Sequence, residues 1–409
     1  MHRVLVTGKI APIGLEILRG ERDISVEFRP DCPRSTLLDI IADFDALISR
    51  SETTVDKALI DRATRLKVIA RAAVGVGNID VDYATEKGIL VMNTPGMNTN
   101  SAAELTFGLL LCACRRIIPA HLHVRASKWE RHRFMGRELR HKTMGIIGLG
   151  NVGHRVARFA QGFDMKVVAF DPYLAPARFE QLQVESVSLE TLCRRADVVS
   201  LHVPLNSETR CLIGRDEIAS MKKGVIVLNA ARGGVMDEAA VLEALRDGRI
   251  AYAGIDTWSN EPVVDSPFRE LDSVVMTPHI GATTIEAQDA VGRSIALQTI
   301  RALRGDVVDY PVNMPQFDVL EGNTVRPYAV LAERLGRFAA QLIAFVPTHV
   351  DVLHRGLSSD DLVSLARLCF LKGFLQHSSD DSITHVNAER RAAHRGLEVR
   401  QMPDKDYGD

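Results

Sequence analysis

The sequence lacks the features that mark membrane, secreted and nucleic-acid-binding proteins. No apolar run approaches the length needed to cross a bilayer. The first residues, Met1 to Val6, read as a strand and not as the charged-then-apolar pattern of a signal peptide. Lysine and arginine number 50 against 52 acidic residues, and no long basic run interrupts this balance. We therefore expect a cytoplasmic protein with no membrane or nucleic-acid partner.

Cysteine is sparse and scattered, which argues against metal binding. The closest pair, Cys112 and Cys114, lies in an apolar stretch and lacks the spacing of a zinc pair. We expect no metal site, and we expect buried free thiols that suit a reducing compartment. The six cysteines are at positions 32, 112, 114, 193, 211 and 369.

Short apolar strands alternate with helical segments through the first 300 residues. Strands that are apolar throughout and separated by helices imply parallel sheets covered on both faces, so the predicted class is α/β. Two long apolar helices, at 98–118 and 285–303, separate two such units. The predicted strands are 4–7, 46–50, 67–71, 89–93, 144–147, 166–170, 198–203, 225–229, 251–256 and 274–277.

The 409 residues should therefore form two or three domains. We predict a discontinuous first domain from 1–96 and 285–312, a nucleotide domain at 97–284 inserted into it, and a small α+β unit at 320–409. In the last unit, Leu331, Leu335, Phe338 and Leu342 form one helical stripe. That stripe must be covered by its own domain or by a partner chain.

The chain is organised around residues 144–171. A strand runs into Gly148-Leu149-Gly150-Asn151-Val152-Gly153, a helix follows, and the next strand ends in Asp171. This order is typical of a Rossmann-type doubly wound sheet that binds a dinucleotide. Glycines permit the tight turn and let a pyrophosphate approach the helix N-terminus. Asp171 can accept hydrogen bonds from a ribose and would repel a 2′-phosphate, which favours NAD over NADP.

Two other segments resemble binding sites but have simpler readings. Gly8 and Gly14 follow a strand, but no acid closes a second strand at the right distance, so we interpret the pair as a structural turn. Residues 121–140 are rich in arginine, histidine and lysine, with Trp129 and Phe134 interleaved. Because acids balance this charge elsewhere, we predict a solvated arm or a subunit contact there.

Three residues that follow strands could perform chemistry. Arg232 can bind a carboxylate with two hydrogen bonds. His279, paired with the carboxylate of Glu261, could exchange a proton with a hydroxyl while hydride leaves the same carbon. Each alone has a structural reading, as a surface ion pair, a turn acid or a loop histidine. Their combination downstream of a dinucleotide motif indicates an oxidoreductase.

At this point the sequence resembles a known family, the D-isomer-specific 2-hydroxyacid dehydrogenases, and within it the phosphoglycerate dehydrogenase branch. The resemblance covers about residues 1–315. It rests on the glycine motif and on the segments 71–80, 93–95, 129–136, 229–234, 256–262 and 278–282.

The resemblance implies NAD as cofactor, a homodimer or higher homo-oligomer, and a small anionic 2-hydroxy or 2-keto acid as substrate. It implies that Arg232, Glu261 and His279 are catalytic, and that the first domain is a smaller flavodoxin-like unit. The implied cofactor-binding residues are Gly148, Gly150, Asn151, Val152, Gly153, Asp171, Val203, Ala230, Asp256, Gly281, Ala282 and Val74. The implied substrate-binding residues are Arg50, Arg71, Val74, Gly75 and Arg232, with Arg131 or Arg133 reaching in from a partner subunit.

Two departures from the family pattern bear on function. Gly77 stands where many phosphoglycerate dehydrogenases have aspartate, which should loosen the adjacent loop. The segment from 326 onward resembles only the first part of the intervening domain of the long-form enzymes, so we expect no serine-binding ACT domain and no inhibition by serine.

The sequence therefore predicts an NAD-dependent oxidoreductase, most simply one for 3-phosphoglycerate at the first step of serine biosynthesis. The same reaction on a phosphonate or another D-2-hydroxy acid is an open alternative. A non-catalytic NAD-sensing binding protein, like the corepressors that share this fold, is disfavoured by the complete set of Arg232, Glu261 and His279.

Overall fold

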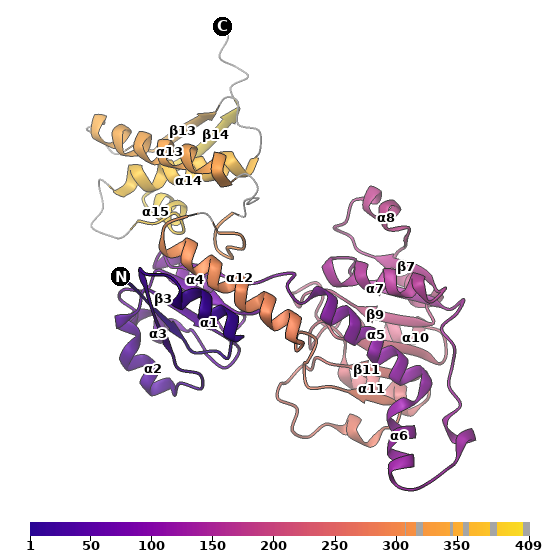
Figure 1. Cartoon of the computed structure of the whole chain (residues 1–409). Helices are drawn as coiled ribbons and strands as arrows, with labels where there is room; N and C mark the ends of the chain where they lie inside the picture. Colours follow the sequence, from indigo (N-terminus) through magenta and orange to yellow (C-terminus); the bar gives the residue numbers. More distant parts are fainter. Residues whose placement is uncertain (307, 316–321, 344–346, 355–359, 377–382, 404–409) are drawn as a thin grey trace. The chain divides into compact units, whose positions relative to one another are not determined.

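The computed structural model describes residues 1–306, 308–315, 322–343, 347–354, 360–376 and 383–403. This part of the chain divides into two compact units. Unit 1 contains Met1–Met97 and the chain from Gln288 onward, and unit 2 contains Asn98–Ala287. Both are built on parallel sheets, which confirms the predicted α/β class (Figure 1).

Unit 1 contains a five-stranded parallel sheet in the order β2-β1-β3-β4-β5, the order of flavodoxin-like sheets. The four strands predicted here are β1, β3, β4 and β5, and β2 was not predicted. The strands are β1 (His2–Val6), β2 (Ile24–Phe28), β3 (Ala46–Ser49), β4 (Val68–Arg71) and β5 (Leu90–Met92). The helices are α1 (Pro12–Arg19), α2 (Arg34–Ile40), η1 (Ile41–Asp43), α3 (Lys57–Arg62), α4 (Val81–Glu86) and α12 (Ile285–Leu303).

The sheet of unit 1 is covered on both faces because its strand residues are apolar in both directions. Val4 and Val6 pack with α1 and α12 on one face, whereas Leu5 packs with α2 and α3 on the other. Of the two glycines predicted to form a structural turn, Gly8 follows β1, whereas Gly14 lies inside α1, and both are required by packing. A Cβ on Gly8 would lie 2.4 Å from Cγ of Arg50, and one on Gly14 would lie 2.7 Å from the carbonyl oxygen of Gly292.

Unit 2 contains a seven-stranded parallel sheet in the order β12-β11-β10-β9-β6-β7-β8. The chain order reverses between β6 and β9, as in the dinucleotide-binding fold. The strands are β6 (Thr143–Ile147), β7 (Lys166–Phe170), β8 (Glu185–Ser186), β9 (Val198–Leu201), β10 (Val225–Asn229), β11 (Ile250–Ile255) and β12 (Val274–Met276). The helical segments are α5 (Thr99–Arg115), α6 (Ile117–Arg125), η2 (Arg131–Phe134), α7 (Asn151–Gly162), α8 (Pro176–Leu182), α9 (Leu189–Arg195), α10 (Arg215–Ser220), α11 (Glu238–Arg246) and η3 (Pro267–Glu270).

Alternate strand residues of unit 2 enter two separate cores. Ile146 and Ile226 pack with α5 and α7, whereas Ile147, Val225 and Val227 pack with α9, α10 and α11. Several helices begin where an acid or serine caps the first turn. In α11, for example, the Asp237 carboxylate accepts from the backbone N–H groups of residues 239 and 240.

The described C-terminal residues of unit 1 form a small α+β layer. It contains α13 (Gly322–Leu342), β13 (His349–His354), α14 (Asp360–Gln376), α15 (Ala388–His394) and β14 (Glu398–Pro403). Helices α13 and α14 approach closely at Gly336 and Gly373. A Cβ on Gly336 would lie 2.1 Å from the oxygen of Phe370. The opposite face of α13 is not covered by the described chain, since Phe338 is 60% exposed and Leu342 68%. The sequence also offers Ser358 and Ser359 as caps for α14 and predicts a frayed polar end at 404–409, but these residues lie outside the described ones.

Among the described residues, no single helix is long and apolar enough to cross a membrane; the bent pair α5–α6, broken by 64°, meets the length and composition test only when joined.

Candidate active site

The glycine loop leaves open space at the N-terminus of α7. Gly148 has φ +88°, a conformation that side chains rarely adopt, and a Cβ there would lie 2.7 Å from the oxygen of His202. A Cβ on Gly153 would lie 2.0 Å from the oxygen of Gly148, so this glycine packs the helix against the loop. A Cβ on Gly150 would meet nothing within 4 Å. The loop therefore has room for an anion beside the first N–H groups of α7, at Asn151 and Val152.

Asp171 follows β7 and contacts this loop. Its Oδ2 accepts a hydrogen bond from the backbone N–H of Leu149 at 2.9 Å, and Oδ1 accepts one from Tyr173 at 3.1 Å. An ionised carboxylate has about four acceptor positions, so two remain for ribose hydroxyl groups. The open glycine and the adjacent acid fit a dinucleotide.

The other cofactor-binding candidates in unit 2 follow the carboxyl ends of neighbouring strands. Val203 follows β9, and its Cγ1 would lie 2.7 Å from a Cβ on Gly148. Ala230 follows β10, Asp256 follows β11, and Gly281 and Ala282 follow β12. Ligands of open α/β sheets bind at this edge.

The carboxylate of Asp256 organises the loop that carries His279. It is fully buried and accepts three hydrogen bonds: from the hydroxyl of Thr277 at 2.6 Å, from the N–H of Ile280 at 2.8 Å and from the N–H of Gly281 at 2.9 Å. The backbone N–H of His279 donates to the Asp256 carbonyl at 2.9 Å. Sequence reasoning missed this positioning role, because the partners lie 21 to 25 residues away. A contact of Asp256 with the cofactor stays a prediction.

Glu261 and His279 form a hydrogen-bonded pair. Nδ1 of His279 lies 2.8 Å from Oε2 of Glu261, and both side chains are partly exposed. Oε1 of Glu261 accepts from the backbone N–H of Trp258 at 2.9 Å, which fixes the carboxylate. His279 has φ +55°, an uncommon conformation for a non-glycine residue that costs about 1–3 kcal/mol. With Nδ1 held by the carboxylate, Nε2 is the nitrogen available for proton exchange.

The loop that carries Arg232 packs against the loop that carries Glu261. A Cβ on Gly233 would lie only 1.8 Å from the oxygen of Trp258, so glycine is required for this approach. Burial lowers the pKa of the half-buried Arg232 guanidinium, while the nearby charge of Glu261 acts in the opposite direction. Nη1 of Arg232 donates to the carbonyl of Ala231 at 2.6 Å. Arg232, Glu261 and His279 therefore belong to one local structure in unit 2.

In unit 1, Arg71 is a buried cation. It is 7% exposed, and burial together with the charge of Arg50 lowers its pKa to about 10, so it stays protonated at neutral pH. Its Nε donates to the carbonyl of Gly75 at 3.1 Å, and the buried Nη1 has no hydrogen-bond partner in the described chain. A buried charge without a partner is unfavourable, and a bound anion would relieve it.

Arg50 follows β3 and is held from one side. Its Nη1 donates to the carbonyl of Lys9 at 2.8 Å and to Oε1 of Gln288 at 2.6 Å. Both bonds use the same nitrogen, which leaves Nε and Nη2 for other acceptors. The sequence did not indicate that Gln288 supports Arg50, because the two residues are 238 positions apart in the chain.

The loop that contains Val74 and Gly75 is fastened at both ends. The amide of Asn93 donates to the Val74 carbonyl at 2.7 Å, and the amide of Asn78 donates to the Arg50 carbonyl at 3.1 Å. A Cβ on Gly77 would meet nothing within 4 Å, so an acid would fit there without a clash. We expected Gly77 to make this loop more flexible, and the hydrogen bonds of Asn78 and Asn93 oppose that effect.

Arg131 and Arg133 lie in η2 of unit 2 on an exposed arm with a large apolar surface. Trp129 is 78% exposed, Met135 76% and Leu122 55%. Arg133 has a long ion pair of 3.9 Å with Glu130. Among the described residues, no group of three or more histidine, cysteine or acidic side chains could hold a metal ion.

Known proteins similar to this chain are dehydrogenases of one family. The profile of the D-isomer specific 2-hydroxyacid dehydrogenase NAD binding domain matches residues 107–281, and that of the D-3-phosphoglycerate dehydrogenase intervening domain matches residues 324–409. A relative from Methanocaldococcus jannaschii, named D-3-phosphoglycerate dehydrogenase, is 42% identical over 400 residues, which are 98% of this chain and 76% of the relative.

Solved structures show the same fold. The TT0316 protein from Thermus thermophilus is similar with a TM-score of 0.71 and 36% identity, over 76% of this chain and 99% of that one. A D-lactate dehydrogenase from Aquifex aeolicus, complexed with NAD and lactic acid, is similar with a TM-score of 0.65 and 26% identity, over 74% of this chain and 96% of that one.

Proposed function

The chain belongs to the D-isomer specific 2-hydroxyacid dehydrogenases and is an NAD-dependent dehydrogenase, and from this premise we propose that it interconverts D-3-phosphoglycerate and 3-phosphohydroxypyruvate. One observation carries the substrate assignment: the buried guanidinium of Arg71, near Arg50, has an N–H group without a hydrogen-bond acceptor in the described chain. A 2-hydroxy acid whose only charge is its carboxylate needs no second cationic site, whereas a phosphate matches two guanidinium groups. The name of the 42% identical relative supports the same substrate.

In the proposed mechanism, Arg232 binds the substrate carboxylate and so fixes the orientation of C2. Nε2 of His279 takes the proton of the C2 hydroxyl during oxidation and returns it to the carbonyl oxygen during reduction. Glu261 holds Nδ1 of His279 and stabilises the imidazolium while the proton resides there. NAD, when bound, accepts the hydride that leaves C2.

Turnover of a panel of 2-keto acids by the full chain with NADH tests the substrate assignment. We expect the highest kcat/KM with 3-phosphohydroxypyruvate, a lower value with its phosphonate analogue, and much lower values with pyruvate and glyoxylate. A preference for an acid without a second anionic group would refute the role given to the two arginines. A preference for the phosphonate would keep that role and change the substrate. Binding of NADH with no turnover of any acid would indicate a sensing protein.

Arg71→Met and Arg50→Met should impair phosphorylated substrates selectively. A charge-assisted hydrogen bond contributes about 1.5–3 kcal/mol, so we expect a loss of roughly ten- to a hundredfold in kcat/KM on 3-phosphohydroxypyruvate. On pyruvate the loss should be small, because that acid has no distal anion. Steady-state kinetics on both acids gives the comparison.

The matched control is Arg62→Met, which removes an exposed arginine at the end of α3 in the same unit. This variant should leave kcat/KM unchanged on both acids. Equal losses on both acids in the Arg50 and Arg71 variants would mean that these arginines are structural.

Asp171→Ala should weaken NADH binding by roughly tenfold or more and narrow the difference from NADPH, because it removes an acceptor for the ribose and a repulsive charge. The same carboxylate also holds the glycine loop at Leu149. Asp171→Asn, which keeps one acceptor oxygen, should therefore bind NADH better than Asp171→Ala while showing the same narrowed preference. Fluorescence titrations with both cofactors measure the two affinities. A wild-type preference for NADPH would contradict the role given to Asp171.

We also propose a homo-oligomer in which the exposed arm around Trp129 forms a subunit contact and Arg131 or Arg133 reaches the substrate of the partner subunit. The apolar surface of this arm supports the contact, since clusters of this kind are typical of interfaces. A cytoplasmic location fits the six cysteines, all of which are free.

A further inference from the structure

A large cavity lies wholly within unit 1, and none of the residues assigned to catalysis lines it. Its volume is about 940 Å³, and we call it the basal pocket. Asp45, Lys67 and Ile89, which precede β3, β4 and β5, line its side next to the sheet. Arg50 and Arg71 stand at the other, carboxyl ends of β3 and β4. The basal pocket and the arginine pair therefore occupy opposite edges of one sheet.

The second side of the basal pocket comes from the C-terminal layer of unit 1. Lys372 on α14 and His385 before α15 line this side. Direct bonds join the two sides. The hydroxyl of Thr384 donates to the carbonyl of Gly88 at 3.0 Å, and Arg390 pairs with Asp82 at 2.6 Å. These bonds join the two sides of the cavity directly.

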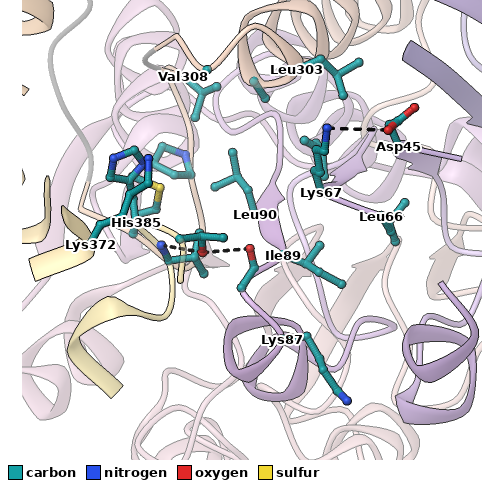
Figure 2. A pocket seen from close by; sticks show the side chains of 18 of the residues that line it. Asp45, Leu66, Lys67, Lys87, Ile89, Leu90, Leu303, Val308, Lys372 and His385 are labelled. Atoms are coloured by element: carbon teal, nitrogen blue, oxygen red, sulfur yellow. Dashed lines mark hydrogen bonds and ion pairs between the residues drawn. The ribbon is translucent and has the colours of Figure 1, made fainter. Parts of the chain in front are cut away.

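The walls of the basal pocket are mainly apolar, with polar groups at two ends. Figure 2 shows Lys372 and His385 on one side and Lys67 with Asp45 on the other, with Leu90 between them. Cavities of about 300–1,000 Å³ with apolar walls and a few polar groups are the usual sites of small organic ligands. The apolar lining includes Leu66, Ile89, Leu90, Leu303, Val308 and Leu365.

The lining of the basal pocket contains more cations than carboxylates: the cations are Arg65, Lys67, Lys87 and Lys372, and the carboxylates are Asp45, Asp61 and Asp306. Asp45 faces both Arg65, at 3.2 Å, and Lys67, at 3.7 Å. Lys372 pairs at 2.9 Å with Glu333, which lies outside the lining and also pairs with Arg337. The other charged lining residues are Lys87, which pairs with Asp61 at 3.2 Å, and Asp306. An anionic group would balance the excess positive charge.

The end at Lys372 is the better site for that group. The Lys372 side chain is 21% exposed, compared with 61% for Lys67, so its charge is less screened by water. Burial and the charge of Lys372 lower the pKa of His385 to about 4, so its ring is neutral at pH 7 and has one N–H to donate. Its Nε2 lies 3.7 Å from Oε2 of Glu333, which is longer than a hydrogen bond. A cation and a neutral donor together suit a carboxylate, sulfonate or phosphate.

We propose that the basal pocket binds an amphiphilic organic acid, with its apolar body against Leu90, Leu303 and Val308 and its anionic group beside Lys372 and His385. This ligand differs from the substrate class, because a phosphorylated three-carbon acid has little apolar surface to place against these walls. The ligand would contact the sheet and the C-terminal layer at once.

Two fluorescent probes that differ by one charge test the proposal on the full chain. 8-Anilinonaphthalene-1-sulfonate carries the anion, and N-phenyl-1-naphthylamine has the same rings without it. Saturating ADP-ribose keeps both probes out of the dinucleotide site. We expect the sulfonate to bind saturably and at least about tenfold more tightly than the neutral probe, the value of one charge-assisted hydrogen bond. Equal affinities would overturn the proposed anion site.

Four variants locate the binding. Lys372→Met should abolish the preference for the sulfonate and leave the affinity for the neutral probe unchanged. The control Lys166→Met, at an exposed lysine of β7, should change the affinity for neither probe. Ala329→Phe, on the pocket wall, should weaken both probes. Phe338→Ser tests the exposed stripe of α13 as an alternative site and should change neither probe. Wild-type affinities in both Lys372→Met and Ala329→Phe, or loss of binding in Phe338→Ser, would refute the assignment.

Discussion

Replacing His279 with alanine should lower kcat by roughly two to four orders of magnitude, the usual contribution of general acid–base catalysis. The affinity for NADH should stay close to the wild-type value, because the imidazole acts on the substrate. Stopped-flow measurement of NADH oxidation, with a separate fluorescence titration of NADH, distinguishes the two quantities. Turnover near the wild-type rate would remove His279 from the mechanism.

The backbone at His279 calls for a second variant. Its φ of +55° is more acceptable to asparagine than to alanine, so His279→Asn preserves the loop better while it removes the base. Both variants should be equally slow if proton transfer is what is lost. Glu261→Gln keeps a hydrogen-bond acceptor but removes the charge that stabilises the imidazolium, so its loss should be smaller. His394→Ala, at an exposed histidine of α15, is the matched control and should have no effect.

Arg232→Met should have the second largest effect. Two charge-assisted hydrogen bonds to the substrate carboxylate contribute together about 3–6 kcal/mol, which corresponds to a loss of roughly a hundredfold to ten-thousandfold in kcat/KM. Every 2-keto acid should be affected, because all of them carry this carboxylate. Kinetics with 3-phosphohydroxypyruvate and pyruvate would show the parallel loss.

Arg232→Lys separates charge from geometry. Lysine keeps the positive charge but cannot form the planar two-bond contact, so the variant should recover only part of the activity. Arg246→Met, at the exposed end of α11, is the control in the same unit. If Arg232→Met impaired only phosphorylated acids, the carboxylate would bind elsewhere and the guanidinium would serve the phosphate.

Local pattern was sufficient for most of the fold. Residues that are apolar on both faces of a strand, as in Ile146 and Ile147, imply helices on both sides of a sheet, and the structure has them there. The long helix predicted at 285–303 is α12 with the same bounds. The glycine motif could be recognised because each glycine is needed for the conformation or packing of the loop itself, which involves only neighbouring residues. Strands β2 and β8 were missed because short, partly exposed segments carry little periodicity.

The sequence by itself determined the α/β class and the dinucleotide motif, since each depends on residues close together in the chain, and it supplied the candidates for catalysis. Only the tertiary structure decided how those residues are held. The bond between His279 and Glu261, the buried carboxylate of Asp256 under the His279 loop, and the support of Arg50 by Gln288 join residues 18 to 238 positions apart. Such contacts depend on the packing of whole elements, and so does the basal pocket, whose two sides come from segments that no local pattern relates.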